Sequence, residues 1–250
     1  PNKYLMNEKY IFVYQDVRGR YMSEGTFTNM TPQVERKTKK DVDESTDTYD
    51  TIEWLLKNIA NNNGKVGQYG TSYPGFYTAA GILADHPALV ASSPQAPISD
   101  FWNDDFLHNG KFMLGYFRTF PVFGVQKTKA EKEGWYMDSF IKPTSEDGLK
   151  FYRELGTLKD GYEKYYKDNF FMTEIMNHPN YDEYWQKRSL LPHLKNVNHA
   201  VMTVGGWFDA EDLAGPLNIY KTIEKTSPKA KNTIVMGPFS HGAWSRETGK

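Results

Sequence analysis

Three polar residues of this sequence have the types and the chain order needed for nucleophilic catalysis: Ser72, Asp209 and His241. A serine hydroxyl is a weak nucleophile until an imidazole removes its proton, and that imidazole needs an acid that fixes its tautomer. Each of the three residues follows a short apolar run typical of a buried strand. Because the carboxyl ends of parallel strands share one edge of a sheet, we predict that the three side chains meet there.

Ser72 is the strongest of the three signals. It stands in Gly70-Thr71-Ser72-Tyr73-Pro74-Gly75, where a strand pattern ends and a helix pattern begins. A nucleophile elbow has this setting, because the sharp turn lifts the hydroxyl above the sheet and aims a helix N-terminus at the developing oxyanion. The run departs from G-x-S-x-G, since Pro74 holds the place of the second glycine. The alternative interpretation of Ser72 is a helix-capping serine.

His241 and Asp209 are the candidate base and acid. Of the six histidines, His241 lies in the loop after the last apolar run, and Asp209 follows the run before it, at the end of Gly205-Gly206-Trp207-Phe208-Asp209. Their alternatives are a structural loop histidine and an acid that caps the next helix. The order Ser, Asp, His is that of α/β-hydrolases. With this assignment the backbone N–H of Tyr73 supplies an oxyanion donor.

The elements that would position these residues alternate between strand and helix. Helical patterns cover Thr46–Asn61, Pro74–Asp85 and Glu211–Glu224, the last one broken or restarted at Gly215-Pro216. The predicted strands are Tyr10–Tyr14, Val66–Tyr69, Leu89–Ser92, Val201–Val204 and Thr233–Met236. Short connections between strands and helices predict an α/β fold, a parallel sheet flanked by helices.

The stretch from Phe106 to about Leu191 breaks this alternation. It is rich in aromatic and charged residues, has no clear strand pattern and contains helix-like pieces such as Ser145–Leu155. We predict a mostly helical cap, residues 106–191, inserted between two parts of the core, residues 1–105 and 192–250, and laid over the carboxyl end of the sheet. The alternative is an independent small domain.

Composition limits the classes of function. Hydrophobic residues make up 39% and charged residues 24% of the 250 residues, as in ordinary globular proteins. The net charge of −1 gives no electrostatic reason to expect nucleic acid or an anionic membrane as a partner. The absence of cysteine excludes disulfides, thiolate metal sites and a cysteine nucleophile. We expect no metal and no cofactor. The sequence does not determine the oligomeric state or the localisation. A periplasmic or secreted location would be expected if a signal peptide has been removed.

Several motifs together resemble a known family. They span most of the chain: Gln15–Arg20 with Ser23–Gly25, Gly70–Tyr73, Gly206–Asp209 and Gly237–His241. The chain resembles the cocaine esterase and X-Pro dipeptidyl-peptidase group of α/β-hydrolases. Within that group it is most similar to the α-amino acid ester hydrolases and the amino acid ester acyltransferases.

The resemblance implies a carboxylate cluster that binds the α-ammonium group of the substrate. By similarity, Asp105, Glu211 and Asp212 form it. A buried ammonium does need compensating charge and acceptors. The alternatives are an acidic first helical turn for Glu211 and Asp212, and a surface acid for Asp105.

The resemblance also implies a serine hydrolase or acyltransferase that cleaves α-amino acid esters or amides, including β-lactam side-chain donors, through an acyl-enzyme on Ser72. The family's first strands, with a tyrosine that donates to the oxyanion, and its C-terminal jelly-roll domain are expected outside these residues. The alternatives are a general carboxylesterase, an X-Pro dipeptidyl-peptidase and a catalytically silent binding fragment.

Overall fold

The computed structural model describes residues 2–34, 38, 40–126, 129–132, 140–142 and 147–246. The chain forms two compact units, which we describe separately. The sheet unit consists of residues 30–59, 63–114 and 178–250, and the helical unit consists of residues 1–29, 60–62 and 115–177. All of the candidate site residues belong to the sheet unit.

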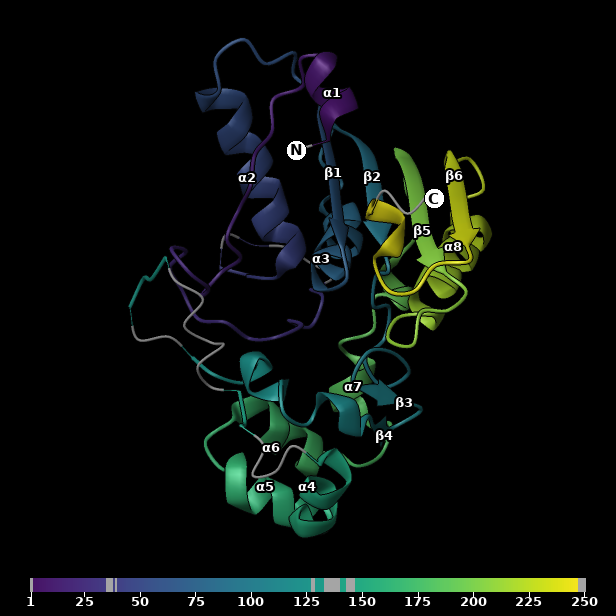
Figure 1. The fold of residues 1–250 in the computed structure, drawn as a ribbon. Coiled ribbons are helices and arrows are strands. Elements are labelled where there is room, and N and C mark those ends of the chain that lie inside the picture. Colours follow the sequence, from purple (N-terminus) through teal and green to yellow (C-terminus); the bar gives the residue numbers. More distant parts are fainter. Residues whose placement is uncertain are drawn as a thin grey trace. The chain divides into compact units, whose positions relative to one another are not determined.

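Four parallel strands form the main sheet in the order β1-β2-β5-β6 (Figure 1). They are β1 (Val66–Thr71), β2 (Leu89–Gln95), β5 (Ala200–Gly206) and β6 (Asn232–Gly237). Each contains one of the predicted apolar runs, so these four strand predictions are confirmed. All four observed strands continue beyond the predicted runs at their carboxyl ends, by one to three residues that are mostly small or polar.

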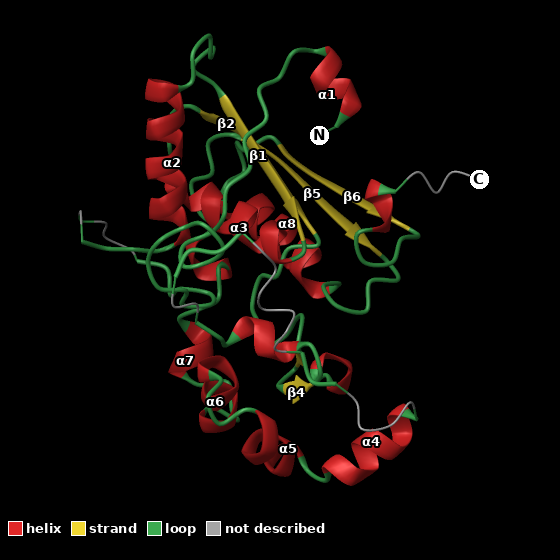
Figure 2. Ribbon diagram, turned by 60° about the vertical axis from the view of Figure 1, so that its left-hand side comes forward, coloured by secondary structure: helices red, strands yellow, loops and turns green. Residues whose placement is uncertain are grey.

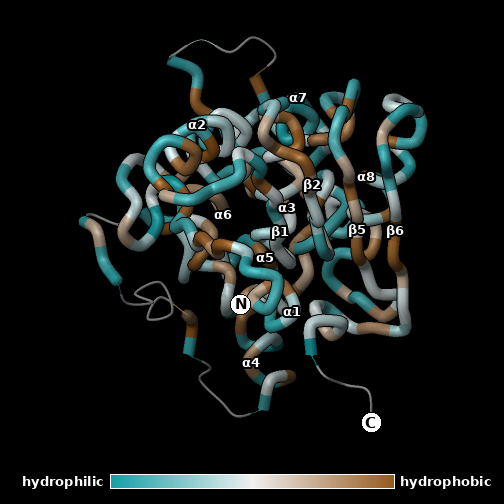
Figure 3. Tube along the Cα trace, turned by 90° about the horizontal axis from the view of Figure 1, so that it is seen from above, coloured by the Kyte–Doolittle hydropathy of each residue, from teal (hydrophilic) through white to brown (hydrophobic). Residues whose placement is uncertain are grey.

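Two helices of the sheet unit, α3 (Tyr73–Gly81) and α8 (Ala214–Thr226), pack against these strands (Figure 2). Helix α2 (Glu44–Asn58) packs against α3, and the same unit also contains the short α7 (Glu183–Gln186). Helix α2 carries Ile52 into a small core with Ala88 and Leu89, which Leu56 and Val66 complete. Hydrophobic stretches along the strands are visible in Figure 3. None of the described helices is long and apolar enough to cross a membrane.

The start of α8 differs from the prediction. The helix begins at Ala214 rather than at Glu211, and Pro216 lies in its first turn instead of breaking it. A proline is tolerated there because the first helical N–H groups have no partner within the helix. Glu211 and Asp212 therefore precede the helix and do not form an acidic first turn.

The predicted strand Tyr10–Tyr14 is wrong. The segment forms no strand, and its side chains are largely exposed, Tyr10 by 62% and Tyr14 by 72%. A strand exists only where a neighbour completes its hydrogen bonds, and this segment, which belongs to the helical unit, pairs with none of the described strands. The apolar pattern was therefore present without a pairing partner.

The helical unit is built around aromatic side chains. Its helices are α1 (Lys3–Asn7), α4 (Gly148–Leu155), α5 (Leu158–Tyr165) and α6 (Phe170–Asn177). Phe117 meets Tyr166 edge to face at 5.0 Å between ring centroids, and Phe120 stacks on Phe171 at 5.6 Å. Such pairs stabilise a core beyond the area that they bury.

The predicted cap segment contributes to both units. Residues 115–177 lie in the helical unit, whereas 106–114 and 178–191 lie in the sheet unit. The segment does contain strand, since β3 (Leu107–His108) and β4 (Lys111–Phe112) form a short antiparallel ribbon. The predicted helix at Ser145–Leu155 corresponds to α4, and positions 145 and 146 lie outside the described residues. That this segment covers the carboxyl ends of the strands stays a prediction.

Arg20, from the first of the motifs, has a structural place in the helical unit. Its guanidinium lies 3.5 Å from the ring centroid of Phe27 and donates to the carbonyl oxygens of Val122, at 2.6 Å, and Val125, at 2.8 Å. Only 6% of the residue is exposed. This arginine therefore joins distant parts of the same unit, which is a packing role.

Candidate active site

Ser72 has the backbone of a nucleophile elbow. It lies between the end of β1 and the start of α3, with φ 68° and ψ −129°. A positive φ is unusual for a residue with a side chain, and such strain is concentrated at functional sites. The turn is held by the Ser72 N–H, which donates to the Gln95 carbonyl at 2.9 Å, and by the Phe76 N–H, which donates to the Ser72 carbonyl at 3.0 Å.

Two glycines make this elbow sterically possible. A Cβ at Gly70 would lie 2.3 Å from the carbonyl oxygen of Pro74, and a Cβ at Gly75 would lie 2.3 Å from that of Gln95. Both contacts involve backbone atoms, which cannot rotate away. The departure from G-x-S-x-G thus has a structural reason, because the second glycine is needed where α3 approaches β2.

Asp209 and His241 form the closest polar pair of the site. Nδ1 of His241 lies 2.9 Å from Oδ2 and 3.1 Å from Oδ1 of Asp209. The Asp209 side chain is fully buried, and its Oδ1 also accepts from the N–H groups of Glu211, at 2.9 Å, and Asp212, at 3.0 Å. A carboxylate held this firmly fixes the imidazole with its proton on Nδ1 and leaves Nε2 for proton transfer.

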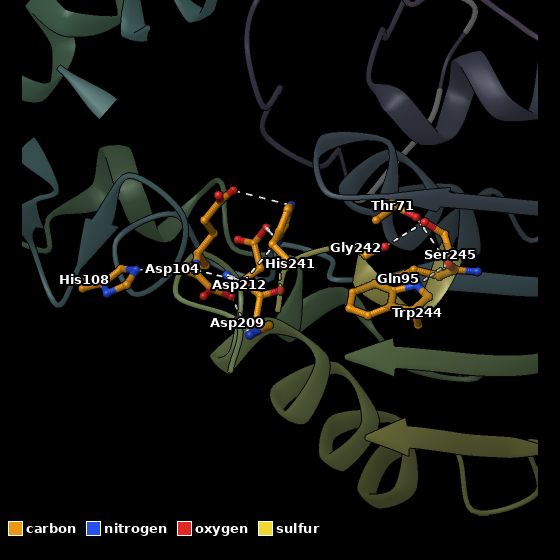
Figure 4. Close-up of polar contacts among 12 residues, drawn as sticks. Thr71, Gln95, Asp104, His108, Asp209, Asp212, His241, Gly242, Trp244 and Ser245 are labelled. Carbon is orange, nitrogen blue, oxygen red and sulfur yellow. Dashed lines mark hydrogen bonds and ion pairs between the residues drawn. The ribbon is translucent and has the colours of Figure 1, made fainter. Parts of the chain in front are cut away.

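Strand register brings the histidine loop to the elbow. Thr71 pairs with Gln95, and Gly206 pairs with Gly237, so the strands end at one edge. Trp244, in the short 3-10 helix Ala243–Ser245 after β6, donates from Nε1 to Oε1 of Gln95 at 2.8 Å. Figure 4 shows Asp209, Asp212 and His241 gathered on one side of the view, with Thr71, Gln95 and Trp244 on the other.

Nε2 of His241 points to an acid rather than to Ser72. It lies 3.5 Å from Oε2 of Glu211. Over the described part of the chain, this nitrogen is buried and has no hydrogen-bond partner, so the Ser72 hydroxyl does not donate to it here. Catalytic hydrogen bonds are often long in the free enzyme and shorten when substrate binds.

Asp212 is a buried carboxylate without hydrogen bonds. It is 0% exposed, and neither of its oxygens has a hydrogen-bond partner among the described residues. Oδ2 lies 3.9 Å from Nδ1 of His241. Burial, together with the charges of Asp105, Asp104, Asp209 and Glu211, raises the pKa of Asp212 well above its ordinary value. A site of this kind favours a cation that would supply the missing charge and donors.

Backbone contacts join the two acidic segments. The carbonyl of Glu211 accepts from the Asp105 N–H at 3.0 Å and from Nε2 of His108 at 3.3 Å. Asp105 is only 6% exposed and has a φ of 66°, so it is not a surface acid. The structure therefore brings all three predicted cluster residues to one place.

Asp104 and His108 are site residues that the sequence interpretation left without a role. Oδ2 of Asp104 accepts from the Gly215 N–H at 2.5 Å, which ties the segment after β2 to the first turn of α8. Burial raises the pKa of Asp104, and the charge of Asp105 adds to this, although the Gly215 N–H opposes it. The Asp104-Asp105 doublet was a usable signal, but nothing near His108 in the sequence indicated its contact with Glu211.

The pKa values of Asp209 and His241 are shifted in opposite directions. Burial raises the pKa of Asp209, but the hydrogen bonds from His241 and from the N–H groups of Asp212 and Glu211 outweigh it, so the net pKa is lowered. Burial lowers the pKa of His241, but the hydrogen bond and charge of Asp209 and the charges of Glu211 and Asp105 raise it overall. Asp209 is therefore ionised, and the imidazolium of His241 is favoured.

The first residue of α3, Tyr73, contributes a backbone N–H at the helix N-terminus, where the dipole favours negative charge. Its ring packs with the rings of Tyr77 and Phe101, at 5.0 Å and 6.1 Å between centroids.

Glu211, Asp212 and His241 each offer one possible metal-ligand atom, and these three atoms lie within 4.8 Å of one another, so they could hold a metal ion. The same atoms take part in the acid and base contacts above, and the sequence predicts no metal.

Comparison with known proteins identifies the family. Residues 2–243 match the model of the X-Pro dipeptidyl-peptidase (S15) family. The chain belongs to this family. It is 24% identical over 259 residues to the cocaine esterase of Rhodococcus sp. (strain MB1 Bresler), an alignment that covers 94% of this chain and 39% of the esterase.

Two solved structures are closely similar. A selenomethionine-labelled α-amino acid ester hydrolase shares 31% identity at a TM-score of 0.84, over 96% of this chain and 38% of the other. An aminopeptidase from a marine sediment archaeon, Thaumarchaeota archaeon, shares 33% identity at a TM-score of 0.86, over 99% and 40%. The fold is that of the α/β-hydrolases, and the chain spans about two fifths of the length of these relatives.

Proposed function

We propose that this chain is the catalytic core of a serine hydrolase that cleaves esters and amides of α-amino acids. The observation that carries the proposal is the Asp209–His241 pair, 2.9 Å apart, beside the buried carboxylate of Asp212, which has no hydrogen-bond partner in the described chain. The pair supplies acid–base chemistry, and the carboxylate supplies a reason to select an amino group. The family and the similar α-amino acid ester hydrolase support both parts.

In the proposed reaction Ser72 Oγ attacks the carbonyl carbon while Nε2 of His241 takes its proton. Asp209 stabilises the imidazolium that forms. The N–H of Tyr73 donates to the oxyanion, an interaction typically worth about 3 kcal/mol of barrier. The tetrahedral intermediate expels the alcohol or amine, which receives the proton from His241. The acyl group on Ser72 then passes to water or to an acceptor amine.

The substrate would be a small amino ester, an amide or a β-lactam with an α-amino side chain. Its ammonium group would lie among Asp105, Glu211 and Asp212. A hydrogen bond to a charged group is worth about 1.5–3 kcal/mol, so the amino group contributes much of the selectivity.

The matched family model favours a second candidate, an X-Pro dipeptidyl-peptidase. That activity also requires recognition of an N-terminal ammonium group, so the carboxylates serve either substrate. Turnover of an X-Pro anilide at rates above those of a simple α-amino ester would favour the peptidase. Equal rates for an α-amino ester and its des-amino analogue would instead indicate a general carboxylesterase.

The proposal is tested by labelling the nucleophile in the full-length protein. A fluorophosphonate probe should modify Ser72, and mass spectrometry with an activated α-amino ester should find the acyl group on the same residue. Ser72→Ala should reduce kcat by about 10⁴-fold or more. Normal turnover by this variant would refute the mechanism, and the absence of any acyl-enzyme would indicate a binding protein without catalytic activity.

A further inference from the structure

The proton-accepting nitrogen of the base already has a neighbour. Nε2 of His241 lies 3.5 Å from Oε2 of Glu211, while Nδ1 is bonded to Asp209. The ring is 22% exposed and the Glu211 side chain 40% exposed. The nitrogen that must receive the serine proton thus faces a carboxylate when no substrate is bound.

Carboxylates surround this imidazole on several sides. Asp209 lies 2.9 Å, Glu211 3.5 Å and Asp212 3.9 Å from its nitrogens, and the charge of Asp105 also acts on it. They favour the imidazolium, which would form an ion pair with Glu211 through Nε2. An imidazolium cannot accept the proton of Ser72, so this arrangement is unproductive.

Of these carboxylates, Glu211 is the one with room to move. Its backbone is held at both ends, since its N–H donates to Asp209 and its carbonyl accepts from Asp105 and His108. Its side chain is longer and partly exposed, whereas the side chains of Asp209 and Asp212 are fully buried. A rotation of the Glu211 side chain can therefore break the contact with His241 and leave the cluster backbone in place.

We propose that Glu211 holds the general base in an unproductive contact in the free enzyme, and that the ammonium group of the substrate releases the base by pairing with Glu211. The proposal rests on the proposed function, because it needs an ammonium group in the carboxylate cluster. It makes Glu211 a positioning residue that couples recognition of the amino group to the availability of His241.

The coupling has a kinetic consequence. A contact that only binds substrate changes KM, whereas one that frees the base also changes kcat. An ester without an amino group would meet a base that is still held by Glu211. Selectivity for amino esters would then appear in both parameters.

The first test is Glu211→Gln in the full-length protein, assayed with an α-amino ester and its des-amino analogue. The variant keeps the shape of the side chain and removes its charge. We expect kcat for the des-amino ester to rise about 3- to 10-fold, and KM for the amino ester to rise. Glu183→Gln is the matched control, since Glu183 is 78% exposed and pairs with Lys187 at 2.6 Å, away from the site.

The second test supplies the cation separately. Methylammonium added to the wild-type protein should increase kcat for the des-amino ester and should leave the Glu211→Gln variant unchanged. Titration of the His241 ring by NMR gives a reading that does not depend on turnover. Its pKa should be lower in Glu211→Gln than in wild type, because one of the charges that raise it is removed.

The outcomes separate the two proposals. If amino esters keep their advantage in KM, but neither Glu211→Gln nor methylammonium increases kcat for the des-amino ester, the release of the base is refuted and the proposed function stands. If Glu211→Gln lowers activity equally on both esters and methylammonium has no effect, the carboxylates are structural, and both proposals are overturned.

Discussion

Two buried aspartates in the sheet unit have opposite surroundings. Asp43, 1% exposed, precedes α2 and accepts from the Thr46 N–H at 2.8 Å, the Ser45 hydroxyl at 2.7 Å and the Val34 N–H at 3.0 Å. Asp212, 0% exposed, precedes α8 and accepts no hydrogen bond from any described residue. The first is a satisfied helix cap, and the second is a carboxylate that accepts no hydrogen bond from the described part of the chain.

The comparison shows how the acid that we propose to bind substrate differs from a structural one. Both residues are acidic, buried and placed before a helix, so sequence position alone does not distinguish them. A buried carboxylate costs free energy unless donors or a cation compensate it. Asp43 is compensated by hydrogen bonds within the fold, and the lack of such bonds at Asp212 supports the proposal that a cationic group of the substrate binds there.

The largest effect is expected at the acid of the proposed triad. Asp209→Asn keeps the size of the side chain but turns an amide toward Nδ1 of His241, which favours the wrong tautomer. We expect kcat to fall by about 10⁴-fold with a smaller change in KM. Steady-state kinetics with an α-amino ester measures this. A loss of less than about tenfold would show that Asp209 is only a cap for the following segment.

The next effect concerns Asp212 itself. If its missing partner is the substrate ammonium, Asp212→Asn should raise KM for an α-amino ester by about 10- to 100-fold, the value of a charged hydrogen bond. KM for the des-amino ester should change little, because that substrate never used the contact. The same substitution at Asp43 is the matched control and should leave both KM values unchanged. Equal KM changes for the two esters in Asp212→Asn would refute a role of Asp212 in binding the ammonium group.

The same pair of variants should move stability in opposite directions. Asp43→Asn turns an amide toward one of its three donors and should lower the free energy of unfolding by about 1–2 kcal/mol. Asp212→Asn removes a buried carboxyl group whose ionised form is disfavoured by burial, and it should raise the free energy of unfolding by about 1 kcal/mol near neutral pH. Urea unfolding of both variants measures these changes.

The stability change caused by Asp212→Asn should also depend on pH. Its pKa is raised in the folded protein, so its contribution to stability is fully present below the ordinary aspartate value of about 4 and is lost as pH rises through the folded pKa. The gain from Asp212→Asn should therefore grow with pH. A gain that is constant from pH 4 to pH 8 would mean that Asp212 does not titrate as the structure requires.

Local sequence patterns predicted those elements whose formation depends mainly on residues near one another in the sequence. The four apolar runs became strands, and the turn at Ser72 has the positive φ of a nucleophile elbow. The run Tyr10–Tyr14 failed because strand formation depends on a neighbour that the pattern cannot report. The start of α8 was misplaced because Asp209 bonds the N–H groups that a helical interpretation assigned to a first turn.

The site was predicted as a set of residues but not as a network. The order Ser, Asp, His placed the candidates after their strands, and the resemblance added the carboxylates. The contacts of Asp105 and His108 with the carbonyl of Glu211 join segments that lie more than 100 positions apart in the sequence. The approach of Glu211 to Nε2 of His241 likewise depends on side-chain geometry, which no spacing encodes.

The smallest effect is expected at Glu44, because its buried carboxylate is better compensated by hydrogen bonds than that of Asp212 and less well than that of Asp43. It begins α2 directly after Asp43, and its Oε1 accepts from the Thr31 N–H at 3.0 Å. Burial raises its pKa to about 7, although the hydrogen bonds from Thr31 oppose the shift.

Since the folded pKa of Glu44 is raised, its contribution to stability is full at acid pH and is lost as pH rises through about 7. Glu44→Gln keeps an oxygen that accepts from Thr31 and removes the titration. We expect the difference in Tm between the variant and wild type to increase in favour of the variant between about pH 5 and pH 8, by a few degrees at most. Melting curves across this range measure it, with Glu183→Gln as the exposed control. Parallel Tm curves for wild type and Glu44→Gln would show that the hydrogen bond from Thr31 is enough to offset the burial of the Glu44 carboxylate. In that case only a carboxylate without any hydrogen bond, such as Asp212, would indicate a binding site.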